Sequence, residues 1–172
     1  SEMCIRDSTM AKIGGSAKAM VVTSSRLHAV RYKVAIDKYV KEKGYTDIAT
    51  LVAFSGRVIA DEGDFTESRM NKFPESQTAE RFGSADYQVL IVAEKFQTGF
   101  DQPLLHTMYV DKVLVGLAAV QTLSRLNRIH SLKSDTFVLD FRNDADEIQK
   151  AFEPYYGKTV ASPTDPNVLW DT

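Results

Sequence analysis

An amide and two guanidinium groups recur at helical spacing in the segment QTLSRLNRIH, where Gln121, Arg125 and Arg128 lie four and then three residues apart. At about 100° per residue, these side chains fall within roughly 60° of one another on a helix. On one side of a helix, these donors could face something anionic. The alternative is a solvated polar face of an amphipathic helix. The apolar side of that helix would be formed by Ala119, Val120, Leu123 and Leu126.

A second segment with chemical potential is TGFD, residues 98–101, which follows an apolar run closely. Gly99 would allow backbone to approach a phosphate or to take positive φ. Thr98 can donate through its hydroxyl, and Asp101 can accept from a ribose hydroxyl or orient a neighbouring arginine. Glycine and aspartate are also common where a strand simply turns, so the segment alone does not decide its role.

Apolar runs and helical periodicity alternate along the chain, which favours an α/β fold with a mostly parallel sheet. Strands are expected at 19–23, 48–54, 88–93, 107–110 and 136–140. Helices are expected at 26–43, 66–73, 76–82, 117–128 and 143–156, and the polar segment 57–64 is expected to be a loop. Sites in such folds lie in loops at the carboxyl ends of the strands.

The first long helix has clear signals at both ends. Ser24 or Ser25 can cap its beginning, and Gly44 can end it. The apolar positions of this helix are expected to include Leu27, Val30, Val34 and Tyr39.

Composition limits what kind of protein this is. The 172 residues have a formal net charge of −2 and suit one domain without the basic excess of a stand-alone nucleic-acid binder, so contacts with anions must be local. Cys4 is the only cysteine, which excludes an internal disulfide and favours a reducing compartment such as the cytoplasm. No apolar run approaches the ~20 residues of a membrane span.

The chain divides into three parts. Residues 1–10, SEMCIRDSTM, carry no signal-peptide pattern and are interpreted as a non-native or unstructured leader. Residues 11–160 are expected to form the domain. Residues 161–172 contain two prolines and are expected to form an irregular tail.

Two kinds of site are not predicted. GGSAKAM, at 14–20, superficially resembles a phosphate-binding Walker A loop, but its spacing fails. His28, His106 and His130 are scattered without metal-ligand spacing, so no metal site is predicted and each is interpreted as a packed or surface histidine.

The order of these segments carries a family resemblance. VLIVAEKFQTGFDQP, a further strand and QTLSRLNR follow one another, with AFSG before them and TFVLDF after them. This series resembles the second RecA-like motor domain of superfamily 2 helicases, and more closely the motor (R) subunit of type I restriction enzymes. The resemblance extends from about Lys18 to about Tyr156. It implies a RecA-like, mostly parallel sheet flanked by helices, the C-terminal lobe of a helicase.

The resemblance implies roles at the nucleotide. Arg125 and Arg128 would be catalytic, reaching the γ-phosphate of ATP held by another RecA-like lobe. Gln121 would position this pair. Gly99 and Asp101 would bind nucleotide and link it to DNA, with Asp101 near the ribose.

The resemblance also implies contacts with the DNA backbone. These would come from hydroxyls and backbone N–H groups, which carry no sequence information and allow stepping along a strand. The residues concerned are Ser24, Ser25, Ser55, Gly56 and Thr98.

The implied protein is an ATP-dependent type I site-specific deoxyribonuclease and translocase, of which this chain would be one inactive part. Its cofactor would be ATP, with Mg²⁺ held by the first lobe. Its partners would be double-stranded DNA, the first RecA-like domain and nuclease domain of the same subunit, and the methylation and specificity subunits, with no membrane.

Two positions depart from the family pattern. Ala93-Glu94 stands where many relatives have Thr-Asp, so a hydroxyl contact is missing there, and Ser124 replaces a glycine without removing a ligand.

Two alternatives to this function remain. One alternative is a motor lobe of another superfamily 2 helicase, of the repair, chromatin or RNA type. The other is a non-motor α/β nucleotide-binding or interaction domain whose polar helix face is merely solvated.

Overall fold

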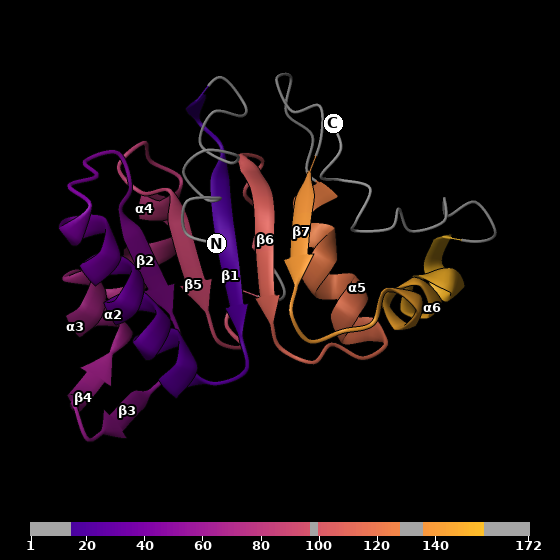
Figure 1. The fold of residues 1–172 in the computed structure, drawn as a ribbon, viewed down its shortest axis with the longest axis horizontal. Helices are drawn as coiled ribbons and strands as arrows, with labels where there is room; N and C mark the ends of the chain where they lie inside the picture. Colours follow the sequence, from indigo (N-terminus) through magenta and orange to yellow (C-terminus); the bar gives the residue numbers. More distant parts are fainter. Residues whose placement is uncertain (1–14, 97–99, 128–135, 157–172) are drawn as a thin grey trace.

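A parallel five-stranded sheet forms the centre of the chain, as expected. The computed structural model describes residues 15–96, 100–127 and 136–156 (Figure 1). Within these ranges the strand order is β2-β5-β1-β6-β7, and every neighbouring pair is parallel. The strands are β1 (Lys18–Thr23), β2 (Thr50–Ala53), β5 (Val89–Val92), β6 (Leu105–Asp111) and β7 (Phe137–Asp140).

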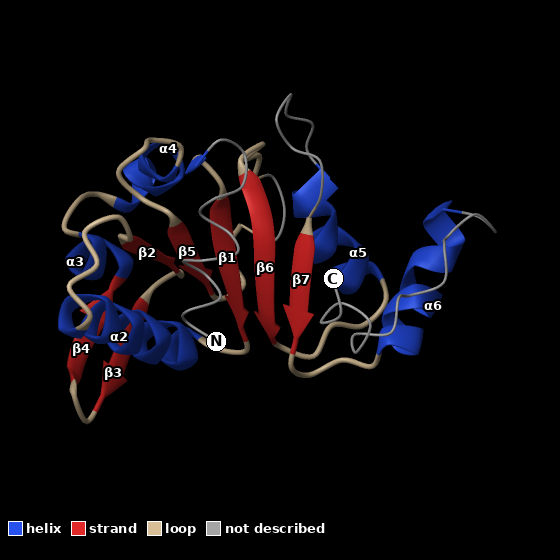
Figure 2. Ribbon diagram, turned by 45° about the horizontal axis from the view of Figure 1, so that its top comes forward, coloured by secondary structure: helices blue, strands red, loops and turns tan. Residues whose placement is uncertain are grey.

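Helices cover both faces of this sheet (Figures 1 and 2), and an apolar layer lies on each face. On one face, α2 (Arg26–Glu42) packs over strand residues such as Val21 and Ile91. On the other face, α4 (Thr78–Phe82), α5 (Leu117–Leu123) and Phe100 pack over residues such as Met20 and Met108. Because successive strand side chains point to opposite faces, continuous apolar runs supply both layers.

The predicted ends of α2 are confirmed, but its buried face is only partly as predicted. Ser25 caps the helix by accepting from the N–H of His28 at 3.1 Å, and Gly44 follows its end with φ +69°. Val30 is buried, whereas the prediction for Val34 was wrong, since that side chain is 52% exposed. The buried stripe instead runs through Ala29, Val30, Lys33 and Ile36.

The segment predicted as a polar loop is a β-hairpin, so that prediction was wrong. It consists of β3 (Arg57–Ala60) and β4 (Gly63–Thr66), paired antiparallel. Val58 packs into the α2 layer while Ile59 points to solvent. Arg57 donates from Nε to Asp64 Oδ1 at 2.6 Å, and its Nη2 donates to the second carboxylate oxygen. Each strand has only four residues, too few for the alternation to stand out among charged neighbours.

The remaining helices agree with expectation in place and type. They are α3 (Glu67–Asn71), the 3₁₀ turn η3 (Glu75–Gln77) that leads into α4, and α6 (Ala145–Tyr156). Among the described helices, none is both long and apolar enough to cross a membrane. Residues 1–10 and 161–172, predicted as leader and tail, lie outside the described residues.

α3 covers the outer edge of the sheet, where a sixth strand would otherwise pair with β2. β2 is an edge strand, yet Val52 and Phe54 are fully buried. Asn71 accepts from the N–H of Val52 at 2.9 Å and donates to its carbonyl oxygen at 2.7 Å. One turn earlier on α3, Glu67 accepts from the N–H of Phe54 at 2.9 Å. Side chains thus satisfy backbone groups that would otherwise be buried without partners.

Asn71→Ala is therefore expected to lower the free energy of unfolding by about 2–4 kcal/mol, because two buried backbone groups lose their partner. Urea denaturation of the chain measures this loss. Ser68→Ala, an exposed change on the same helix, is the matched control and is expected to stay within about 0.5 kcal/mol. Equal losses in the two variants would contradict the proposed role of Asn71.

Candidate functional site

A hydrogen bond joins the two segments that the sequence singled out. Arg125 Nη1 donates to the carbonyl oxygen of Phe100 at 2.9 Å, next to Asp101. Phe100 is 5% exposed and belongs to the same core as Leu126, while Asp101 is exposed. Arg125 is thus held against the segment that leads from β5 to β6.

The helix that carries Arg125 differs from the prediction. The expected helix at 117–128 is α-helical only to Leu123, and η4 (Ser124–Asn127) continues it as a 3₁₀ turn. Such turns are frequent at helix ends. Gln121 is exposed as predicted, but Arg125 is partly buried and does not simply face water. Thr98, Gly99 and Arg128 lie outside the described residues.

The exit of β5 has an unusual backbone. Glu94 and Phe96 both adopt left-handed φ, at 62° and 63°. Such a conformation costs a side-chain-bearing residue roughly 1–2 kcal/mol, so neighbouring contacts must stabilise it. The ring of Phe96 packs on that of Phe100 with centroids 5.0 Å apart. Between the two strained residues, Lys95 donates to both carboxylate oxygens of Glu67 at 3.0 and 3.1 Å.

The described members of the predicted DNA-backbone set lie at the carboxyl ends of β1 and β2. Arg26, which follows Ser24 and Ser25 on α2, donates from Nη1 to the carbonyl oxygen of Ser55 at 3.1 Å. Gly56 has φ +78°, and a Cβ there would lie 2.9 Å from the same nitrogen. The structure therefore brings the loops after β1 and β2 together through a residue to which the sequence analysis gave no role.

The three hydroxyls at this edge differ in what they already do. Ser24 and Ser55 are exposed. Ser25 accepts from the N–H of His28, and its Oγ also lies 2.6 Å from the Nδ1 of that ring. Ser25 thus serves first as the helix cap.

A charged cluster at the same edge ties α2 to the exits of β6 and β7. Tyr32 donates to Asp111 Oδ2 at 2.6 Å, and Arg142 Nε donates to Asp111 Oδ1 at 2.6 Å. These hydrogen bonds hold the pKa of Asp111 below its usual range. Burial, with the hydrogen bond to Asp111, raises the pKa of Tyr32 to about 12. Asp111 therefore stays ionised and Tyr32 protonated near neutral pH, which suits a structural tie rather than acid–base chemistry.

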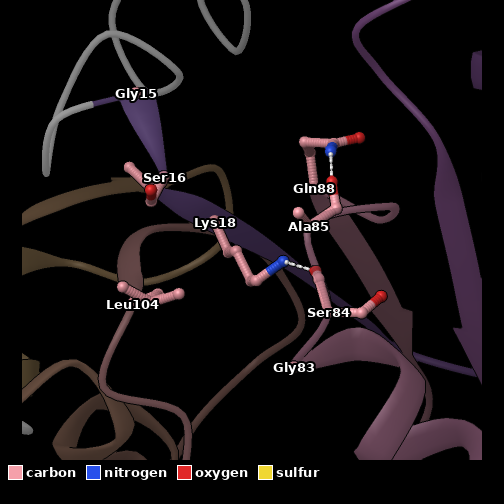
Figure 3. Close-up of a pocket in the computed structure, with 9 residues that line it drawn as sticks. Gly15, Ser16, Lys18, Gly83, Ser84, Ala85, Gln88 and Leu104 are labelled. Atoms are coloured by element: carbon pink, nitrogen blue, oxygen red, sulfur yellow. Dashed lines mark hydrogen bonds between the residues drawn. The ribbon is translucent and has the colours of Figure 1, made fainter.

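A separate hollow of about 240 Å³ lies at the amino end of β1 (Figure 3). Residues 15–18 and 83–85 line it with Gln88 and Leu104, and none of the predicted site residues does. Lys18 donates from Nζ to the carbonyl oxygen of Ser84 at 2.6 Å and to that of Tyr87. Burial lowers the pKa of Lys18 to about 8. Because Lys18 already has two carbonyl partners, we assign it a structural role.

No group of three or more His, Cys, Asp or Glu side chains lies close enough to hold a metal ion in the part of the chain that is described. His28 is a surface residue at the start of α2. His106 is 3% exposed, with Nδ1 2.7 Å from Thr107 Oγ1, so it is packed. His130 lies outside the described residues.

Comparison with known proteins finds one family that covers the middle of the chain. Residues 62–143 match the family described as type I restriction enzyme subunit R domain 3. The chain is 34% identical over 143 residues to the putative type I restriction enzyme MjaIXP endonuclease subunit of Methanocaldococcus jannaschii, covering 80% of this chain and 13% of that protein. It is 29% identical over 156 residues to the HindI endonuclease subunit of Haemophilus influenzae, covering 83% and 14%. The chain thus spans only about a seventh of each relative's length.

Two solved structures that share this fold belong to helicases. The Mycobacterium smegmatis helicase Lhr, bound to ssDNA and AMP-PNP, matches 96% of this chain and 20% of its own with a TM-score of 0.59 at 12% identity. Mss116p, bound to ssRNA and AMP-PNP, matches 90% of this chain and 27% of its own with a TM-score of 0.52 at 15% identity. The expected RecA-like fold of a helicase C-terminal lobe is confirmed.

The contact between Arg26 and the loop after β2 can be tested with two glycines. Gly56→Ala and Gly44→Ala both place a side chain at positive φ, which costs roughly 1–2 kcal/mol. Only at Gly56 would the new Cβ displace Arg26, since nothing lies within 4 Å at Gly44. We expect Gly56→Ala to lower the free energy of unfolding by about 1 kcal/mol more, the worth of one hydrogen bond.

Urea denaturation of both variants, each with and without Arg26→Ala, measures this difference. The extra loss is expected to disappear when Arg26 is already absent. A difference that persists without Arg26 would show that this contact does not hold the loop.

Proposed function

The chain belongs to the family of type I restriction enzyme R subunits, and from this premise we propose that it is the second motor lobe of an ATP-dependent DNA translocase. The family match argues against the two alternatives left open by the sequence, a helicase of another class and a non-motor domain. In the intact enzyme, ATP would bind between this lobe and a first RecA-like lobe, and hydrolysis would change the closure of the two.

The observation that carries the proposal is the hydrogen bond from Arg125 to Phe100. It holds the guanidinium of Arg125 at the carbonyl oxygen of Phe100, directly before Asp101, in the segment that links β5 to β6. An arginine held in place in this way is preorganised for the charge that develops on a transferring phosphoryl group. In the proposal, Arg125 and Arg128 reach the γ-phosphate, Gln121 positions them, and Gly99 and Asp101 contact the nucleotide.

The candidate site residues that are described suit the part of such a site that binds phosphate oxygens, rather than the part that binds Mg²⁺. Arg125 and Gln121 are donors suited to phosphate oxygens. Among the described residues, no group of three or more His, Cys, Asp or Glu side chains could hold a metal ion. In the proposal, Mg²⁺ and the β-phosphate are held by the first lobe.

The DNA contacts are proposed for the loops after β1 and β2. Ser24 and Ser55 are exposed and present hydroxyls to solvent. Gly56 is also exposed and presents backbone next to Ser55, whose carbonyl oxygen accepts from Arg26. Ser25 and Thr98 complete the proposed set. Contacts of this kind are made with phosphates irrespective of base sequence, which suits an enzyme that moves along duplex DNA.

The proposed partners follow from the family. They are the first RecA-like and nuclease domains of the same subunit, the methylation and specificity subunits, and duplex DNA, in the cytoplasm. Cleavage would belong to the nuclease domain, so the whole protein would be the deoxyribonuclease.

Arg125→Lys in a full-length R subunit containing this lobe is expected to lower the rate of ATP turnover at saturating ATP by roughly 10³-fold, the usual worth of such an arginine. Lysine keeps the charge but cannot present the planar fork. Arg31→Lys is the matched control, because Arg31 is exposed on α2 and its ion-pair partner among the described residues is Glu62. Turnover within about twofold of the unchanged subunit would remove the catalytic role of Arg125.

The isolated chain is expected to hydrolyse no ATP above the buffer rate, because it supplies only the arginine side of the site. Phosphate release from a purified preparation measures this. Robust turnover that copurifies with the chain through successive columns would refute the half-site assignment.

A further inference from the structure

Glu67 is a buried carboxylate to which the proposed function gives no role. Its side chain is 0% exposed. Besides the N–H of Phe54, its partners are the Thr78 hydroxyl at 2.7 Å and the ammonium group of Lys95. One carboxylate thus contacts the end of β2, the start of α4 and the exit of β5.

Stability alone does not account for this arrangement. Removing a charged pair from water costs several kcal/mol, and well-packed apolar residues are often as stable or more so. A neutral amide could still accept from Phe54. The negative charge of Glu67 is what requires a cationic partner, and Lys95 supplies it. This ion pair holds Lys95 between Glu94 and Phe96, the two strained residues of the β5 exit.

The contacts of this pair lead to both proposed sites. On one side, Phe54 directly precedes Ser55 and Gly56 in the proposed DNA loop. On the other side, Lys95 directly precedes Phe96, whose ring packs on Phe100, and the carbonyl of Phe100 accepts from Arg125. Every step is a covalent neighbour or a described contact.

We infer that Glu67 and Lys95 form a positioning pair that couples DNA contact at the loop after β2 to the placement of Arg125 at the nucleotide. The inference rests on the proposed function. A shift of the loop after β2 would move Phe54, and the carboxylate would transmit that movement to the β5 exit. In this inference both residues act through their protein neighbours, and neither would itself bind nucleotide or DNA.

The test uses the full-length R subunit, assembled with its partner subunits, and measures ATP turnover with and without duplex DNA. Glu67→Gln and Lys95→Met each remove one charge, and the double variant removes both. We expect the factor by which DNA raises turnover to fall about tenfold in each single variant, and no further in the double variant. Turnover without DNA, and the affinities for AMP-PNP and for DNA, are expected to change less than about threefold, whereas a merely structural defect would lower all of them together.

Glu75→Gln is the matched control. Glu75 also faces Lys95, at 3.8 Å, but its side chain is 60% exposed, and the N–H of Phe54 is donated to Glu67 instead. The same substitution is therefore made next to the same lysine without touching the proposed connection. We expect the DNA response to remain within about twofold of the unchanged subunit, as for most surface substitutions.

The outcomes separate this inference from the proposed function. An unchanged DNA response in folded Glu67→Gln and Lys95→Met variants overturns the inference alone, as does an equal loss in Glu75→Gln. If Glu67→Gln does not fold, Lys95→Arg and Lys95→Met decide, because arginine should retain the response and methionine should lose it. An unchanged subunit whose ATP turnover ignores DNA would overturn the proposed function and this inference with it.

Discussion

The carboxylate of Glu67 is the interaction on which most of this half of the lobe depends. A buried charge is tolerated only when donors surround it, so the three elements that contribute donors must meet at one point. That requirement fixes α3 against β2, the start of α4 against α3, and the strained exit of β5 beside both. The exit in turn carries Phe96 onto Phe100, and so sets where Arg125 finds its carbonyl.

The fold was largely predictable because its signals are local. Strands buried on both faces appear as unbroken apolar runs, and Ser25 and Gly44 mark the ends of α2 by rules that need no tertiary information. The β3–β4 hairpin was missed because its stability comes from Val58 packing under α2 and from the pair Arg57–Asp64, neither of which a short polar segment reveals. Val34 is exposed because it lies on the flank of the stripe formed by Ala29, Val30, Lys33 and Ile36, so helical spacing from Val30 alone does not bury it.

The residues of the candidate site could be proposed from the sequence and stay predictions, whereas the contacts that support them could not be foreseen. Arg125 and Asp101 were singled out by chemistry and order, and the structure brings Arg125 to the residue next to Asp101. Arg26, Glu67 and Lys95 were not singled out, because their partners include backbone groups far along the chain, which no spacing rule describes. Lys95 lies two residues after the apolar run that ends at Ala93, which is a weak signal, and no comparable signal marks Arg26 or Glu67.

The pairing of Asn71 and Glu67 with β2 also decides how the lobe can meet a neighbour. The N–H and C=O of Val52 and the N–H of Phe54 already have side-chain partners on α3. An extended segment from another protein therefore cannot use these groups to add a strand to the sheet. A neighbour on that side meets helix side chains instead. In the proposed motor, whose lobes would approach and separate at every turnover, such a border would permit close contact without an irreversible intermolecular sheet.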